Sequence, residues 1–198
     1  LKQTIKDMVI VGKGILAADE SVKTATKRLA SINVESTEET RRQYRNLILN
    51  APGMEKYICG VILFEETLHQ KSDDGILFPE LLIKKGIVPG IKVDDGLADM
   101  EGSAGEQFTN GIDTLGQRLE EYKKSKPRFA KWRAVYNISE TTPSDLIIKR
   151  NAQDLARYAK IRQQHDLVPI VEPEVLIDGT HSIEACYKAT EKAQKAVF

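Results

Sequence analysis

Short apolar runs that end in charged residues alternate with amphipathic segments along the whole chain. The apolar runs occupy residues 13–20, 57–66, 87–96, 128–138 and 167–175. Continuous apolar, β-branched runs of this length are typical of strands that are buried on both faces of a parallel sheet. We therefore predict five parallel strands. The last of them begins with a core segment, Leu167 to Val171.

Segments in which apolar residues recur at helical spacing separate these runs. Ser36 and Glu39 have the spacing of a capping box and predict a helix over residues 40–50. Thr142, Pro143 and Asp145 open a second helix, which carries a continuous apolar face. The other predicted helices cover residues 1–12, 65–72, 115–122 and 183–197.

Strands that alternate with helices indicate βαβ units and a parallel sheet. Five successive units without a GxGxxG turn favour a (β/α)8 TIM barrel over an open dinucleotide-binding sheet. A complete barrel of this kind takes about 250 residues. We therefore interpret residues 1–198 as a single partial barrel domain with strands 1 to 5 of eight. The helical stripes at both ends lack capping residues, so we expect the chain to be part of a longer one.

The composition narrows the classes of partner. Lysine and arginine total 29 residues and so do aspartate and glutamate, so no basic excess favours nucleic acid or anionic lipid. No apolar run approaches the roughly 20 residues that span a bilayer, and we expect no membrane partner. Cys59 and Cys186 lack CxxC spacing, which favours two reduced thiols in a cytoplasmic protein. The three histidines show no metal-ligand spacing, so we predict neither a metal nor a cofactor.

Charged residues stand in pairs at the ends of three predicted strands. Glu172 and Glu174 are two residues apart on a strand, so their side chains point to the same face. The same spacing relates Lys92 to Asp94, and Lys131 to Arg133, while Asp19 ends the first strand. In a TIM barrel the carboxyl ends of the strands meet at one rim, where function collects. Cations and anions are thus predicted to converge there.

Two interpretations of this rim remain open at this point. The charges form salt bridges that only stabilise the fold, or they carry chemistry. Clustered lysine and arginine suit a phosphorylated substrate, and a lysine beside other cations has a lowered pKa that suits a base or Schiff-base nucleophile. Two nearby carboxylates can transfer protons when their pKa values are driven apart. Glu65 and Glu66 instead fit the first turn of a helix.

Several segments resemble class I fructose-bisphosphate aldolase. They are GKGILAADES, GVILFEETLHQK, PGIKVDDG, FAKWR, LARYAKIRQQ and VPIVEPEVL, and they occur in that family's order. The resemblance implies a (β/α)8 barrel that reversibly cleaves fructose 1,6-bisphosphate into dihydroxyacetone phosphate and glyceraldehyde 3-phosphate. A lysine Schiff base serves as the electron sink without metal. It also implies a cytoplasmic, glycolytic homotetramer.

The resemblance assigns roles to particular residues. Asp19 assists C–C cleavage, Lys131 helps to protonate and dehydrate the carbinolamine, Glu172 is the general acid/base, and Glu174 supports the imine-forming lysine. The implied substrate contacts are Ser21, Lys27, Arg28, Arg41, Lys92 and Arg133.

The chain departs from the family pattern in three places. Val22-Lys23-Thr24 stands where the family has T-G-S, and Asp95 stands where many relatives have lysine. The family's imine-forming lysine lies on the sixth strand, in a segment like LLKPNMV, which these 198 residues do not contain. Two rivals therefore stay open: a non-catalytic scaffold derived from an aldolase, and a Schiff-base enzyme in which Lys131 itself forms the imine.

Overall fold

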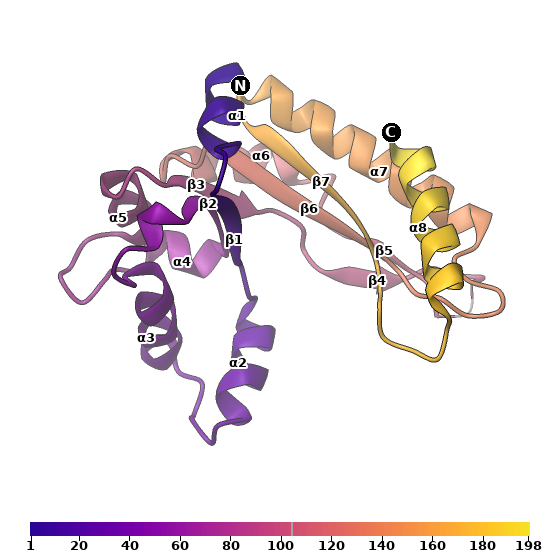
Figure 1. Cartoon of the computed structure of the whole chain (residues 1–198), viewed down its shortest axis with the longest axis horizontal. Helices are drawn as coiled ribbons and strands as arrows, with labels where there is room; N and C mark the ends of the chain where they lie inside the picture. Colours follow the sequence, from indigo (N-terminus) through magenta and orange to yellow (C-terminus); the bar gives the residue numbers. More distant parts are fainter. Residues whose placement is uncertain (104) are drawn as a thin grey trace.

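Five parallel strands form one curved sheet in the computed structural model, which describes residues 1–103 and 105–198 (Figure 1). The strands pair in the order β1-β2-β3-β6-β7. Their bounds are Gly14–Ala18 (β1), Ile58–Leu63 (β2), Val88–Lys92 (β3), Phe129–Tyr136 (β6) and Val168–Val175 (β7). The five predicted strands are confirmed, and the fold is an incomplete (β/α)8 barrel.

Helices connect successive strands, as βαβ units require. Figure 1 shows α7 and α8 alongside the long strands β6 and β7, and α2 and α3 beyond the carboxyl end of β1. The helices are α1 (Lys2–Met8), α2 (Val22–Ala30), α3 (Glu38–Leu49), the 3-10 helix η1 (Met54–Lys56), α4 (Glu65–His69), α5 (Phe78–Lys84), α6 (Leu115–Lys123), α7 (Asp145–Gln164) and α8 (Ile183–Val197). No helix in the described part of the chain is long and apolar enough to cross a membrane.

The apolar core divides into two clusters. The larger one includes Trp132 and Tyr158, which place their ring centroids 5.5 Å apart between β6 and α7. The smaller one joins Met8 to Ile62, Val88 and Phe129. Met8 is the last residue of α1, which precedes β1 in the chain. This short helix therefore packs against the strands although it does not connect two of them.

The N-cap of α3 lies one residue later than the capping box predicted from the sequence. Its capping box is formed by Thr37 and Thr40: the Thr40 amide donates to Thr37 Oγ1 at 3.1 Å, and the Thr37 amide donates to Thr40 Oγ1 at 2.8 Å. The predicted box of Ser36 and Glu39 is wrong, because Ser36 Oγ instead lies 2.7 Å from Thr26 Oγ1 on α2. Ser36 with Glu39 and Thr37 with Thr40 have the same spacing of three residues, so the sequence alone did not decide which pair caps α3.

The strand β7 is less buried than its apolar sequence indicated. Leu167 is buried, but every residue from Val168 to Val175 is only partly buried. The prediction that residues 167–171 are buried on both faces is wrong, because β7 pairs with β6 alone in the described part of the sheet.

A short antiparallel hairpin, which the sequence analysis missed, follows β3. Its strands are β4 (Leu97–Asp99) and β5 (Gln107–Thr109). The Asp95 amide donates to the Asn110 carbonyl at 3.0 Å, and the Asn110 amide donates to the Gly96 carbonyl at 2.9 Å. The base of this hairpin is thus fixed at the carboxyl end of β3.

Candidate active site

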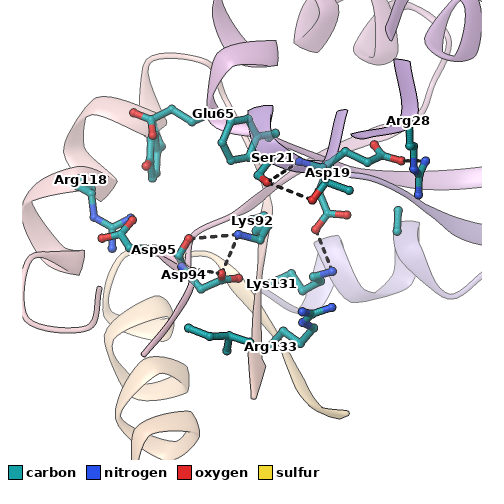
Figure 2. Close-up of a pocket in the computed structure, with 17 residues that line it drawn as sticks. Asp19, Ser21, Arg28, Glu65, Lys92, Asp94, Asp95, Arg118, Lys131 and Arg133 are labelled. Carbon is teal, nitrogen blue, oxygen red and sulfur yellow. Dashed lines mark hydrogen bonds and ion pairs between the residues drawn. The ribbon is translucent and has the colours of Figure 1, made fainter. Parts of the chain in front are cut away.

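A cavity of about 610 Å³ opens at the carboxyl ends of the strands (Figure 2). Its lining comes from residues at or just beyond the carboxyl ends of β1, β2 and β3, from Lys131 and Arg133 within β6, and from α6, which are far apart in the sequence. Six of the predicted site residues line it: Asp19, Ser21, Arg28, Lys92, Lys131 and Arg133. The curved sheet therefore brings together most of the cations that the sequence analysis singled out.

Lys131 lies between two carboxylates. Its Nζ is 2.8 Å from Asp19 Oδ2 and 3.3 Å from Glu172 Oε2, and the residue is only 8% exposed. Glu172 lies on β7, next to β6, whereas Asp19 follows β1, which is three strands away in the sheet order. A flat sheet would hold β1 and β6 roughly 14 Å apart at the usual strand spacing. The contact between Lys131 and Asp19 is therefore a product of the sheet's curvature.

The surroundings of Lys131 keep its proton in place. Burial disfavours the ammonium, but the carboxylates of Asp19 and Glu172 outweigh it and raise the pKa of Lys131. The idea that clustered cations lower a lysine pKa is wrong for this residue, because its charged contacts are anions. Burial also raises the pKa of Glu172, against the opposing attraction of Lys131. Glu172 is thus protonated more readily than an ordinary glutamate.

Arg133 and Glu174 form a second cation–carboxylate pair between β6 and β7, each two residues further along its strand than Lys131 and Glu172. Arg133 Nη1 is 3.1 Å from Glu174 Oε2, and Arg133 is paired with Glu172 in the ladder between β6 and β7. The two carboxylates therefore face the same side as the two cations of β6, as the spacing of two residues predicts. In this structure Glu174 contacts Arg133 rather than a lysine.

Lys92 is the last residue of β3 and lies near the middle of the residues that line the cavity (Figure 2). Its Nζ is 2.7 Å from Asp94 Oδ1 and 5.9 Å from the centre of the Phe64 ring. This ion pair brings Lys92 and Asp94 together as expected, although Asp94 lies two residues beyond the end of β3.

The helix α2 brings one polar and one cationic side chain to the cavity. Ser21 is the N-cap of α2, and its Oγ accepts a hydrogen bond from the Thr24 amide at 3.3 Å. Arg28, in the last turn of α2, forms an ion pair with Glu20 and donates to Tyr44 Oη at 2.7 Å. Lys27 is exposed and does not line the cavity. Its predicted contact with substrate has no geometric support here.

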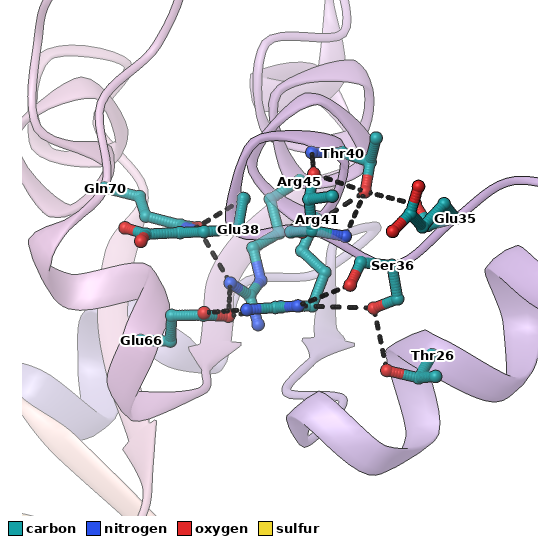
Figure 3. A network of polar contacts seen from close by, with 10 residues as sticks. Thr26, Glu35, Ser36, Glu38, Thr40, Arg41, Arg45, Glu66 and Gln70 are labelled. Atoms are coloured by element: carbon teal, nitrogen blue, oxygen red, sulfur yellow. Dashed lines mark hydrogen bonds and ion pairs between the residues drawn. The ribbon is translucent and has the colours of Figure 1, made fainter.

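Arg41 also lies outside the cavity lining, in a separate network of ion pairs (Figure 3). It donates to Glu66 through Nε at 3.0 Å and Nη2 at 2.6 Å, and to Ser36 Oγ at 3.2 Å. The buried Arg45 contacts the same carboxylate and donates to Gln70 Oε1 at 2.7 Å. Hydrogen bonds from Arg41, together with those from Arg45, outweigh burial and lower the pKa of Glu66. For Arg41 the salt-bridge interpretation fits its contacts, and a role in substrate binding stays a prediction.

Two residues of α6 line the cavity and were not singled out from the sequence. Arg118 forms an ion pair with Asp95 at 2.9 Å and donates to the Val93 carbonyl at 2.9 Å. Tyr122, one turn further along α6, is 3% exposed. Their spacing of four residues places both on the inward face of the helix, and this spacing was the available signal.

The described residues contain no group of three or more His, Cys, Asp or Glu side chains that could hold a metal ion. Cys59 and Cys186 are both free thiols. The charged groups at the cavity are instead arranged as lysine and arginine side chains paired with carboxylates. This arrangement can bind anions and move protons.

The model of the class I fructose-bisphosphate aldolase family, described as glycolytic, matches residues 1–198. The chain belongs to this family. It is 54% identical over 198 residues to "Fructose-bisphosphate aldolase 5, cytosolic" of Arabidopsis thaliana. It is 51% identical over the same length to a "Probable fructose-bisphosphate aldolase class 1" of Xanthomonas axonopodis pv. citri. Both alignments cover 100% of the chain.

A solved structure gives the same picture in three dimensions. The fructose-bisphosphate aldolase of Plasmodium falciparum superposes on 98% of this chain with a TM-score of 0.94 and 49% identity. The chain spans 55% to 59% of the length of the two named relatives and 57% of that solved chain. The parallel half-barrel of this chain thus matches the corresponding part of that aldolase structure.

Proposed function

We propose that the protein carrying this chain reversibly cleaves fructose 1,6-bisphosphate into dihydroxyacetone phosphate and glyceraldehyde 3-phosphate. The reaction passes through a lysine Schiff base and uses no metal or cofactor. The observation that carries this proposal is the position of Lys131 between Asp19 and Glu172, in a cavity that Lys92 and Arg133 also line. Membership of the class I aldolase family supports the choice of substrate.

The three central residues are suited to different proton-transfer roles. Glu172 has a raised pKa because it is buried, so it can hold a proton and donate it to the carbinolamine hydroxyl as water leaves. Lys131 has a raised pKa, because its two carboxylates outweigh burial, and it stays an ammonium that stabilises developing negative charge. Asp19 holds this ammonium at 2.8 Å and faces the cavity, where it can assist C–C cleavage.

The remaining cations suit a substrate with two phosphates. Lys92, Arg133 and Arg28 all line the cavity, and guanidinium groups bind phosphate through paired hydrogen bonds. Ser21 adds a hydroxyl at the N-terminus of α2. Glu174 orients Arg133 at 3.1 Å, and its support of an imine-forming lysine is part of the proposal. We further propose that residues 1–198 form one domain of a cytoplasmic homotetramer.

Borohydride trapping tests this function directly. The protein at its natural length is incubated with dihydroxyacetone phosphate and sodium borohydride, and the labelled peptide is mapped by mass spectrometry. We expect cleavage of fructose 1,6-bisphosphate and label on a lysine other than Lys131. Lys131 is a poor nucleophile because Asp19 and Glu172 raise its pKa despite burial.

The other outcomes separate the two rival functions. Label on Lys131 would favour an enzyme in which this residue forms the imine. Absence of both label and cleavage would favour a scaffold protein that keeps the fold without the reaction.

A further inference from the structure

The ammonium of Lys92 is held by a single residue. Among the residues that the structure describes, the polar contacts of Lys92 Nζ are both to Asp94: 2.7 Å to the carboxylate Oδ1 and 3.3 Å to the backbone carbonyl oxygen. Figure 2 shows both contacts at the middle of the cavity lining. An ammonium has three N–H donors, so at least one remains for an oxygen of a bound molecule.

Asp94 is itself firmly placed. Its side chain is only 6% exposed, and Oδ1 also accepts a hydrogen bond from the Gly96 amide at 3.3 Å. The two residues that follow it are joined to Asn110 by two backbone hydrogen bonds at the base of the β4–β5 hairpin. Hydrogen bonds therefore fix both the Asp94 carboxylate and the backbone that follows it.

The two groups depend on each other. Within the described chain, Asp94 Oδ2 is buried and has no hydrogen-bond partner. The ion pair of this carboxylate is with Lys92, through Oδ1, so Lys92 balances its charge. A buried carboxylate without a cation is strongly disfavoured, which keeps the ammonium close to it. A free lysine side chain, in contrast, samples many rotamers around its four-carbon stem.

We propose that Asp94 is a positioning residue that holds the Lys92 ammonium in the cavity, with an N–H directed to one phosphate oxygen of the substrate. This inference rests on the proposed function, because it takes a sugar bisphosphate as the ligand. Asp94 does not touch the substrate. It acts on binding through Lys92, and a substitution of Asp94 raises KM while kcat changes little.

A double-mutant cycle on the protein at its natural length tests the proposal. The variants are Asp94→Ala, Asp94→Asn, Lys92→Met and the double variant D94A/K92M. We measure KM and kcat for fructose 1,6-bisphosphate, and the binding of the same compound by calorimetry. D94A is expected to raise KM about tenfold, as when one charge-assisted hydrogen bond is lost. D94N is expected to recover part of this, because its amide oxygen still accepts from the ammonium.

The decisive result is the coupling between the two positions. If Asp94 acts only through Lys92, D94A has no further effect on KM in the K92M background. Asp95→Asn is the matched control: it removes the same charge one residue further on, beside the same cavity, from a carboxylate that pairs with Arg118 at 2.9 Å. The effects of D95N and K92M are expected to add.

The outcomes distinguish this proposal from the function it rests on. Additive effects of D94A and K92M, or a D94A effect confined to kcat, overturn the positioning role while the aldolase reaction stands. A protein that binds fructose 1,6-bisphosphate without cleaving it contradicts the proposed function, but its binding constants still report the coupling. A protein that neither binds nor cleaves this compound overturns both.

Discussion

Lys131 illustrates how single side chains define this site. A charge buried without a partner costs several kcal/mol, and Lys131 is 8% exposed. The carboxylates of Asp19 and Glu172, whose oxygens lie 2.8 and 3.3 Å from Lys131 Nζ, compensate this buried charge. Burial and charge act in opposite directions on Lys131 and Glu172, and both residues emerge with raised pKa values. Each of the two side chains therefore keeps its proton to a higher pH in the folded protein than in the unfolded one.

The pKa of Glu172 predicts how its substitution changes stability with pH. Below the ordinary glutamate pKa of 4.5, the carboxyl is neutral in both the folded and the unfolded protein. As pH rises above 4.5 the unfolded carboxyl ionises first, so ionisation favours unfolding until the raised folded pKa is passed. The parent is expected to lose stability relative to Glu172→Gln across this window, as measured by urea unfolding at several pH values.

Glu120→Gln provides a control of opposite sign. Hydrogen bonding to Lys123 lowers the pKa of the exposed Glu120 carboxyl. The parent should therefore lose stability relative to this variant as pH falls through the lowered pKa. Parallel pH profiles for the two variants would contradict the assignment of a raised pKa to Glu172.

At the residue scale the sequence predicts faces but not partners. A spacing of two along a strand was enough to place Lys131 with Arg133, and Glu172 with Glu174, on one side. Nothing local indicated that Arg41 pairs with Glu66 across α3 and α4, because that contact depends on how two helices pack. The residue roles implied by resemblance therefore had to be compared with the geometry. A contact with substrate is supported more for Arg28, which lines the cavity, than for Lys27, which does not.

Among the elements, β3 and β6 are in close contact where Gly90 lies against the Phe129 ring. A Cβ added to Gly90 would lie 2.3 Å from the Phe129 ring, whereas one added to Gly60 on β2 would lie 3.4 Å from the same ring. Gly90 therefore leaves room for a ring that fills the smaller apolar cluster.

Alanine substitutions at these two glycines form a matched pair. Gly90→Ala is expected to lower the free energy of unfolding by about 3 kcal/mol, because the ring or the strand must move. Gly60→Ala should change it by less than about 1 kcal/mol, since its contacts are ordinary. Denaturant unfolding of both variants checks this, and equal losses would show that Phe129 adapts freely.

Element prediction succeeded where apolar runs were long and failed where elements were short. All five parallel strands were found, because each run ends in a change of polarity. The strands β4 and β5 have three residues each, too few for alternation to be visible. The burial of β7 was overestimated because a sequence does not reveal which strand lies at the edge of a sheet.

For the whole molecule, the curvature of the sheet is the property on which the site depends. It places the end of β1 against β6, although β2 and β3 lie between them in the sheet. The strands β1 and β7 each have one neighbour in the described sheet, and apolar side chains such as Val11 and Ile15 are exposed. Unpaired strand edges and exposed apolar residues favour association.

A polypeptide of only these 198 residues is therefore expected to aggregate or to require a partner. Size-exclusion chromatography and thermal unfolding of the purified polypeptide test this expectation. A monomer that unfolds cooperatively would show that the unpaired strand edges and exposed apolar residues do not drive association. The same experiments on the protein at its natural length serve as the reference.

The central claim is that Glu172 moves protons for an imine while the cations of the cavity bind the phosphates. The most direct test is the rate of imine formation with dihydroxyacetone phosphate in single turnovers, measured beside its binding constant, for Glu172→Gln and for Glu174→Gln. Glu172→Gln is expected to slow imine formation by about 10²-fold or more, as for loss of a general acid, with binding nearly unchanged. A normal rate with weakened binding would contradict it.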